Sequence, residues 1–208
     1  MTKPPQPEIS STVAATSMFV EVLVVGIGSF VALAILAADV LGMRGVSHFA
    51  AILNSTPAAG VVLAFSYALG ILMDRVADNA LGSYRRKLRS RFFGSDSAYA
   101  KARKDLIAFP ELVARSEYAR SRMRICRGWS FNAAALTVSL DIAVLRFPVA
   151  GRPLALAVVT VLGIFLVVGF FSSWRSITAT GYRKLAEQTA ATSIDIHVPI
   201  QADSGAQV

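Results

Sequence analysis

Charged residues and cysteine are both scarce in this chain of 208 residues. Only 16% of the residues are charged and 54% are hydrophobic, whereas a soluble domain is typically about 25% charged. An ordinary water-soluble enzyme is therefore not expected. The single cysteine, Cys126, excludes an intramolecular disulfide and a cysteine-based metal or iron–sulfur site. The two histidines, His48 and His197, leave little for haem, zinc or acid–base chemistry.

Known catalytic motifs are also missing. The sequence has no glycine-rich phosphate loop, no zinc-metalloprotease helix and no nucleophilic-serine elbow. No two carboxylates lie deep in neighbouring apolar stretches, where an intramembrane hydrolase would need them. We therefore expect a non-enzymatic protein with no catalytic residue, no cofactor and no bound metal.

Four long apolar stretches are present instead. They cover residues 22–38, 57–73, 128–145 and 153–174. Each is close to the ~20 residues that a helix needs to cross ~30 Å of hydrocarbon, and none alternates every two residues like a barrel strand. A signal peptide is the alternative for the first stretch, but Glu21 stands where a basic segment would be expected. We predict an all-α, polytopic membrane protein with four transmembrane helices in a bundle.

Lysine and arginine are unevenly distributed around these stretches. With four spans, both termini and the connection between the second and third spans share one side, and that side carries 18 of the 21 basic residues. Such residues are retained in the cytoplasm. We predict that both termini and residues 77–127 are cytoplasmic. The lack of targeting elements and the composition favour the cell (inner) membrane.

Helical periodicity continues beyond the second and third spans. Apolar residues recur every three to five positions up to Phe92, and Gly94 and Ser95 are typical of a helix end. A second helix is expected to begin at Pro110. We predict that helices over 57–93 and 110–147 form a basic cytoplasmic hairpin over residues 77–127, bridged at its tips by a short helix within 96–109.

The remaining segments follow from this topology. We predict disordered tails over residues 1–16 and 192–208, because they are rich in Pro, Ser, Asp and Gly. Residues 175–191 should extend the fourth helix. The outer loop 39–56 should hold a short apolar helix on the membrane surface, with a re-entrant pore helix as the alternative. A short outer loop covers 146–152. The transmembrane parts are 17–76 and 128–174.

Asp141 is the polar residue that stands out within a span. A carboxylate in hydrocarbon is costly and faces a partner or water. It could line an ion or proton pathway. Alternatively, it could accept a bond from a Ser or Thr of a neighbouring helix, or pair with Arg44 or Arg146.

Several residues mark the inner ends of the spans. Glu21 lies in the first turn of the first span, where an acid complements the helix N-terminus and where Arg127 or Arg175 could reach it. Trp129 and Trp174 fall at the predicted inner boundary. Indoles prefer the headgroup level, so we interpret both as interface anchors.

Asp74, Arg75 and Asp78 form a charge cluster at the inner end of the second span. Two acids four residues apart share a helix face. They could bind a cation, but we favour an anchoring role in which they pair with Arg124 or Arg127.

The sharpest feature is a run of basic residues: Arg85, Arg86, Lys87, Arg89 and Arg91. Beside a membrane such a run is typical of contact with anionic lipid headgroups. A cytoplasmic protein partner is the second interpretation, and nucleic acid is unlikely.

The leading hypothesis is a multi-pass membrane protein whose basic hairpin docks a soluble partner or an anionic membrane surface. The first alternative is an oligomeric channel or small transporter with Asp141 on its pathway. The second is a membrane-bound enzyme that acts on lipid through Asp74, Arg75 and Asp78. A homo-oligomer is possible in any of these cases.

Overall fold

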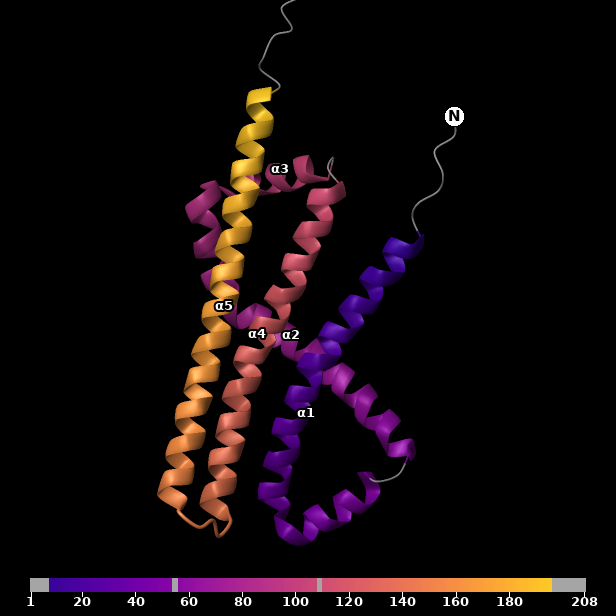
Figure 1. Cartoon of the computed structure of the whole chain (residues 1–208), viewed down its shortest axis with the longest axis vertical. Coiled ribbons are helices and arrows are strands. Elements are labelled where there is room, and N and C mark those ends of the chain that lie inside the picture. The colour runs from indigo at the N-terminus through magenta and orange to yellow at the C-terminus, as the bar shows by residue number, and fades with distance from the viewer. Residues whose placement is uncertain (1–7, 54–55, 108–109, 196–208) are drawn as a thin grey trace, which may run out of the picture.

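The computed structural model describes residues 8–53, 56–107 and 110–195, which form five α-helices (Figure 1). They are α1 (Glu8–Leu53), α2 (Thr56–Phe93), α3 (Asp96–Leu106), α4 (Pro110–Arg146) and α5 (Arg152–Asp195). These ranges contain no strand. Every helix except α3 is long and apolar enough to cross a membrane. The all-helical class with four candidate spans is therefore confirmed.

The break between α2 and α3 lies where the sequence predicts it. Gly94 has a positive φ of 66° and donates its backbone N–H to the carbonyl of Ser90 at 3.2 Å. Ser95 then caps α3, because its hydroxyl accepts the N–H of Ala98 at 3.2 Å. This glycine-then-serine pair ends one helix and starts the next without a long loop.

The boundaries of the two predicted tails are wrong. Helix α1 begins at Glu8, so the predicted N-terminal tail is helical from that residue on, and α5 continues to Asp195. Neither stretch contains an interior Gly or Pro, so a helix nucleated in the apolar core propagates outward. At the other end of its span α1 runs on to a kink at Gly42 (φ 72°, ψ 179°), and a further helical segment ends at Leu53. Residues 1–7, 54–55 and 196–208 lie outside the described part of the chain.

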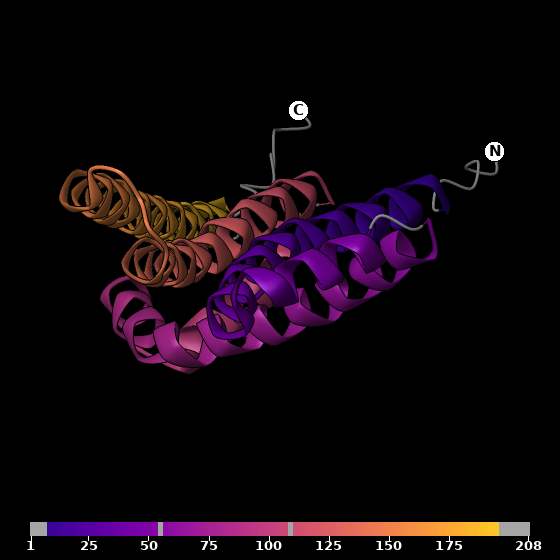
Figure 2. The same ribbon diagram turned by 90° about the horizontal axis from the view of Figure 1, so that it is seen from below.

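The four long helices form an open arrangement. Helix α1 packs against α2 and α4, and α4 packs against α5, but α1 and α5 do not touch. Helix α2 crosses the others obliquely and reaches α5 near the end of the molecule that carries α3 (Figures 1 and 2). The predicted four-helix bundle is therefore not closed within the described residues. We call the end that carries α3 the α3 end.

Two glycines set the crossing of α1 and α2. A Cβ at Gly26 would overlap the backbone carbonyl of Ser66, and a Cβ at Gly70 would overlap the carbonyl of Val22. The two backbones therefore approach as closely as small residues permit. Another row of small residues on α2, at positions 60, 64 and 68, is exposed and takes no part in this crossing.

Helices α1 and α4 run parallel and are joined by hydrogen bonds about two helical turns apart. Asn132 donates to the carbonyl of Val25 at 2.6 Å, and Ser139 donates to the carbonyl of Ala32 at 3.0 Å. Seven residues further along α4, Arg146 donates to the carbonyl of Val40, which is eight residues beyond Ala32, at 3.4 Å. A repeat of about seven residues keeps the same faces together along two helices, so these hydrogen bonds fix the register of α1 against α4.

Aromatic rings hold the α3 end together. Tyr182 of α5 contacts Phe92 and Phe93 of α2 and Tyr99 of α3, with ring centroids 5.7–6.4 Å apart. The guanidinium of Arg89 lies 5.0 Å from the centroid of Tyr99. The extension of α5 is thus part of this end, which is an assembly of α2, α3, α4 and α5 and not a hairpin of α2 and α4 alone.

Candidate functional site

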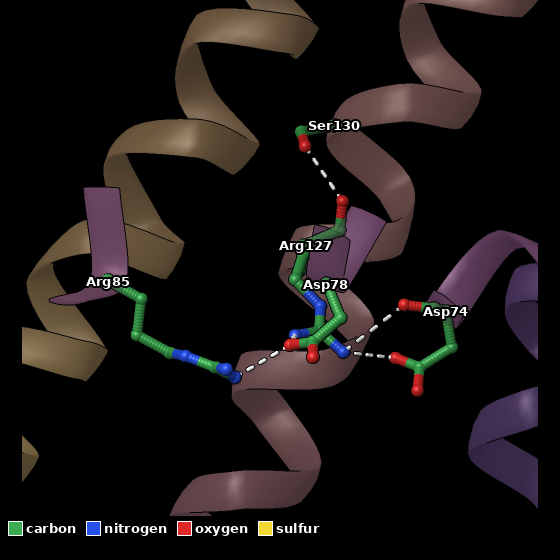
Figure 3. A network of polar contacts seen from close by, with 5 residues as sticks. All are labelled: Asp74, Asp78, Arg85, Arg127 and Ser130. Atoms are coloured by element: carbon green, nitrogen blue, oxygen red, sulfur yellow. Dashed lines mark hydrogen bonds and ion pairs between the residues drawn. The ribbon is translucent and has the colours of Figure 1, made fainter. Parts of the chain in front are cut away.

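Arg127 of α4 is the centre of a charge cluster where α4 meets α2 (Figure 3). Its two terminal nitrogens form ion pairs with Asp74 and Asp78 of α2. Arg85 approaches Asp78 from the other side at 2.6 Å. Only 10% of the Arg127 side chain is exposed, against about a third of each aspartate. We call Asp74, Asp78, Arg85 and Arg127 the charge cluster.

The chain builds this cluster from local spacing and one distant residue. Asp74 and Asp78 share a face of α2 because they are one turn apart, and Arg85 follows two turns later. Two negative and two positive charges balance, which suits a partly buried site. The predicted pairing of both acids with Arg127 is present. Arg75, in contrast, is exposed and forms none of these pairs.

Both carboxylates of the cluster are thus occupied by guanidinium groups, which favours a role in holding α2 to α4. Throughout the described ranges there is no group of three His, Cys, Asp or Glu side chains placed to hold a metal ion.

The five residues of the basic run have two different surroundings. Arg85 joins the charge cluster, and Arg89 pairs with Asp96 of α3 at 2.6 Å. Arg86, Lys87 and Arg91 are exposed, and the structure shows no ion pair for any of them. Their three positive charges are therefore available to an outside partner, whereas Arg85 and Arg89 serve the fold.

Glu21 is buried, with 7% of the residue exposed, and its carboxylate accepts the hydroxyl of Ser17 at 2.9 Å. The expected ion pair with Arg127 or Arg175 is absent. Arg127 is engaged by the two aspartates, and Arg175 is exposed. The local Ser17 bond is what satisfies this acid.

Asp141 lies between α4 and α5. Its two carboxylate oxygens both face the hydroxyl of Thr160, at 3.1 and 3.2 Å. This is the threonine partner that the sequence offered as one alternative. Of the other offered partners, Arg146 donates to a carbonyl of α1, and the side chain of Arg44 lies outside the described part.

The two tryptophans pack inside the protein. Trp174 is 1% exposed and contacts Tyr84 of α2 and Phe171 of α5, with ring centroids 5.8 and 5.6 Å away. Trp129 is half-buried and lies against Phe170 at 5.9 Å. The prediction that Trp174 anchors the protein among lipid headgroups is therefore wrong, because its indole fills the contact between α2 and α5.

Sequence reasoning missed the buried polar residues of α1 and α4. Asn132 is fully buried, and it accepts a hydrogen bond from Ser29 of α1 at 2.8 Å. Asp39 is 2% exposed, and neither of its carboxylate oxygens has a hydrogen-bond partner. One signal could have found Asn132: Asn132 and Ser139 of α4 are polar residues seven positions apart within an apolar stretch.

A scan against protein-family models matches no family, and searches of curated proteins and of solved structures give no significant match.

Proposed function

We propose that this chain is a non-enzymatic, multi-pass membrane protein whose α3 end is a basic docking platform in the cytoplasm. Four apolar helices of sufficient length support insertion in a membrane. The excess of lysine and arginine on the side of the termini and of α3 supports the orientation, with the inner membrane as the proposed location.

The proposal rests on the different surroundings of the five basic residues in the run. Arg85 and Arg89 are neutralised by acids of the protein itself, while Arg86, Lys87 and Arg91 remain exposed. An exposed group of like charges attracts a partner of opposite charge. The partner is therefore anionic, either an acidic protein or an anionic membrane surface.

The platform is supported by ordered contacts. The charge cluster joins α2 to α4, and the aromatic contacts of Tyr182 join α5 to α2 and α3. A surface held on packed helices presents its charges in a fixed arrangement, which lowers the entropy cost of binding. The Thr160 bond gives Asp141 a structural partner, so we retain docking in preference to an ion pathway.

The test uses the full chain in nanodiscs of neutral lipid. The triple variant Arg86→Gln, Lys87→Gln, Arg91→Gln should lose binding to vesicles rich in phosphatidylglycerol and to an acidic peptide. The matched control changes the same number of exposed charges on α3, at Lys101, Arg103 and Lys104, and should retain binding. If the unaltered protein binds neither probe, the docking function is refuted.

The orientation has its own experiment. A fluorescent protein that folds only in the cytoplasm, fused after Val208 of the full chain, should fluoresce. A periplasmic reporter enzyme at the same position should be inactive. The opposite pattern would overturn the proposed topology.

A further inference from the structure

An open groove lies on the exposed side of α2 near its junction with α3. It has a volume of about 580 Å³ and is lined by Ser83, Tyr84, Arg86, Lys87, Ser90 and Asp96. We call these six residues the basic groove. The groove is separate from the charge cluster and shares no residue with it.

The groove has a net positive charge. Arg86 and Lys87 contribute two positive charges, and Asp96 contributes one negative charge that is already paired with Arg89 at 2.6 Å. The guanidinium of Arg86 lies along the surface of the groove, because it donates a hydrogen bond to the hydroxyl of Ser83 at 3.2 Å. A ligand here would meet two cationic groups and the hydroxyl of Ser83, since the hydroxyl of Ser90 already donates to the backbone carbonyl of Lys87 at 3.0 Å.

This combination of donors suits a phosphate group. Guanidinium and ammonium groups form charge-assisted hydrogen bonds with phosphate oxygens, and the hydroxyl of Ser83 adds a neutral donor. A carboxylate of an acidic protein offers fewer oxygens in a flatter arrangement. The chemistry of the groove therefore favours a phosphate.

The height of the groove relative to the apolar spans indicates where such a phosphate comes from. Tyr84 lines the groove, and its ring contacts that of Trp174 at 5.8 Å. Trp174 is the last residue of the longest uncharged stretch, and Arg175 follows it. The end of that stretch marks the inner edge of the hydrocarbon, so Tyr84 lies at the headgroup level.

Arg86 and Lys87 are close enough to this level to act on headgroups. Lys87 is three residues beyond Tyr84, which is about 5 Å along a helix. This distance between Tyr84 and Lys87 is well within the screening length of about 10 Å at 0.1 M salt.

We propose that the basic groove binds the phosphate headgroup of an anionic phospholipid of the inner leaflet. This inference rests on the proposed function, because it assumes the membrane orientation given above. It goes further by naming the ligand class and by limiting the phosphate donors to Ser83, Arg86 and Lys87. Arg91 is not part of the groove.

The experiment is native mass spectrometry of the full chain in mild detergent, titrated with phosphatidylglycerol, phosphatidylcholine or inorganic phosphate. We expect preferential binding of phosphatidylglycerol. The double variant Arg86→Gln, Lys87→Gln should bind it about thirtyfold more weakly, from ~1 kcal/mol for each of the two basic residues near the surface. The variant Ser83→Ala keeps the charge and should also weaken binding.

The control removes the same charge elsewhere, as Arg103→Gln, Lys104→Gln on α3, where both side chains are exposed. It should bind phosphatidylglycerol as the unaltered chain does. An equal loss in the control would show general attraction without a site and overturn the inference. So would unchanged binding in both groove variants, or displacement of the lipid by inorganic phosphate at equal concentration.

Failure of this inference can be distinguished from failure of the proposed function. If the triple variant no longer binds the acidic peptide while all variants bind phosphatidylglycerol equally, the docking function is supported and the lipid site is refuted. Circular dichroism of each variant should show unchanged helix content, and a variant that fails this check is replaced by its single substitutions.

Discussion

The side-chain amide of Asn132 on α4 donates a hydrogen bond to the backbone carbonyl of Val25 on α1, at 2.6 Å. The same side chain accepts the hydroxyl of Ser29 at 2.8 Å. All three partners lie in stretches apolar enough to be surrounded by lipid. In such surroundings an unpaired amide has no water to bond to, so this contact ties two non-consecutive helices together.

The first prediction concerns that contact. Asn132→Leu keeps a similar volume but removes both hydrogen bonds, and it should lower the free energy of unfolding by about 1–2 kcal/mol. Asn79→Leu is the matched control, because Asn79 is exposed on α2. Unfolding in mixed micelles, followed by circular dichroism, measures both. Equal stability of the two variants would show that the Asn132 bonds contribute nothing.

The second prediction concerns the crossing of α1 and α2. Gly26→Leu places a side chain where the backbone of α2 already lies, and should cost about 3 kcal/mol or more. Gly60→Leu introduces the same side chain on α2 into open space and should be tolerated. The yield of monodisperse protein after detergent extraction distinguishes them. A well-folded Gly26→Leu protein would mean that the two helices do not cross there.

The third prediction concerns Asp39. A buried carboxylate without a hydrogen bond destabilises a fold when it is charged, and both oxygens of Asp39 are in that situation. Asp39→Asn puts a neutral amide of the same shape in place of the ionisable group and should stabilise the protein by about 1 kcal/mol. Asp141→Asn should have a smaller effect, because Asp141 already has Thr160. A lower melting temperature for Asp39→Asn would show that Asp39 has an ionic partner.

The fourth prediction concerns the charge cluster. Arg127→Gln leaves Asp74 and Asp78 without their shared cation, and should destabilise the protein by about 2 kcal/mol, a value reduced for the partial exposure of both acids. Adding Asp74→Asn and Asp78→Asn should recover much of the loss. Arg75→Gln is the control from the exposed face of the same turn. Thermal unfolding measures all of these variants, and the absence of recovery would argue against a direct pairing.

Local signals in the sequence explain what could be predicted. The end of α2 at Phe93 and the start of α3 at Asp96 follow from Gly94 and Ser95, which act on their immediate neighbours. The acids at positions 74 and 78 share a face through helix geometry alone. These features need no knowledge of which helices meet.

What could not be predicted depends on contacts between distant segments. A tryptophan at the end of an apolar stretch, such as Trp174, is typical of a lipid-facing anchor. Only the oblique path of α2 brings the ring of Tyr84 into contact with it. The course of α2 thus decides the surroundings of Trp174, and no local pattern encodes it. Arg85 and Arg89 are a different case, because each pairs with an acid only seven residues away, Asp78 and Asp96, and this spacing could have separated them from their exposed neighbours.

The hydrogen bonds between the parallel helices α1 and α4 also have a consequence for biogenesis. Their partners are 103–107 residues apart in the chain, and a ribosome adds about 5–20 residues per second. Helix α1 is therefore complete roughly 5–20 s before α4 leaves the ribosome. During this interval only α2 can engage α1, through Gly26 and Gly70. The first helical pair thus forms early and provides the surface onto which the later pair assembles.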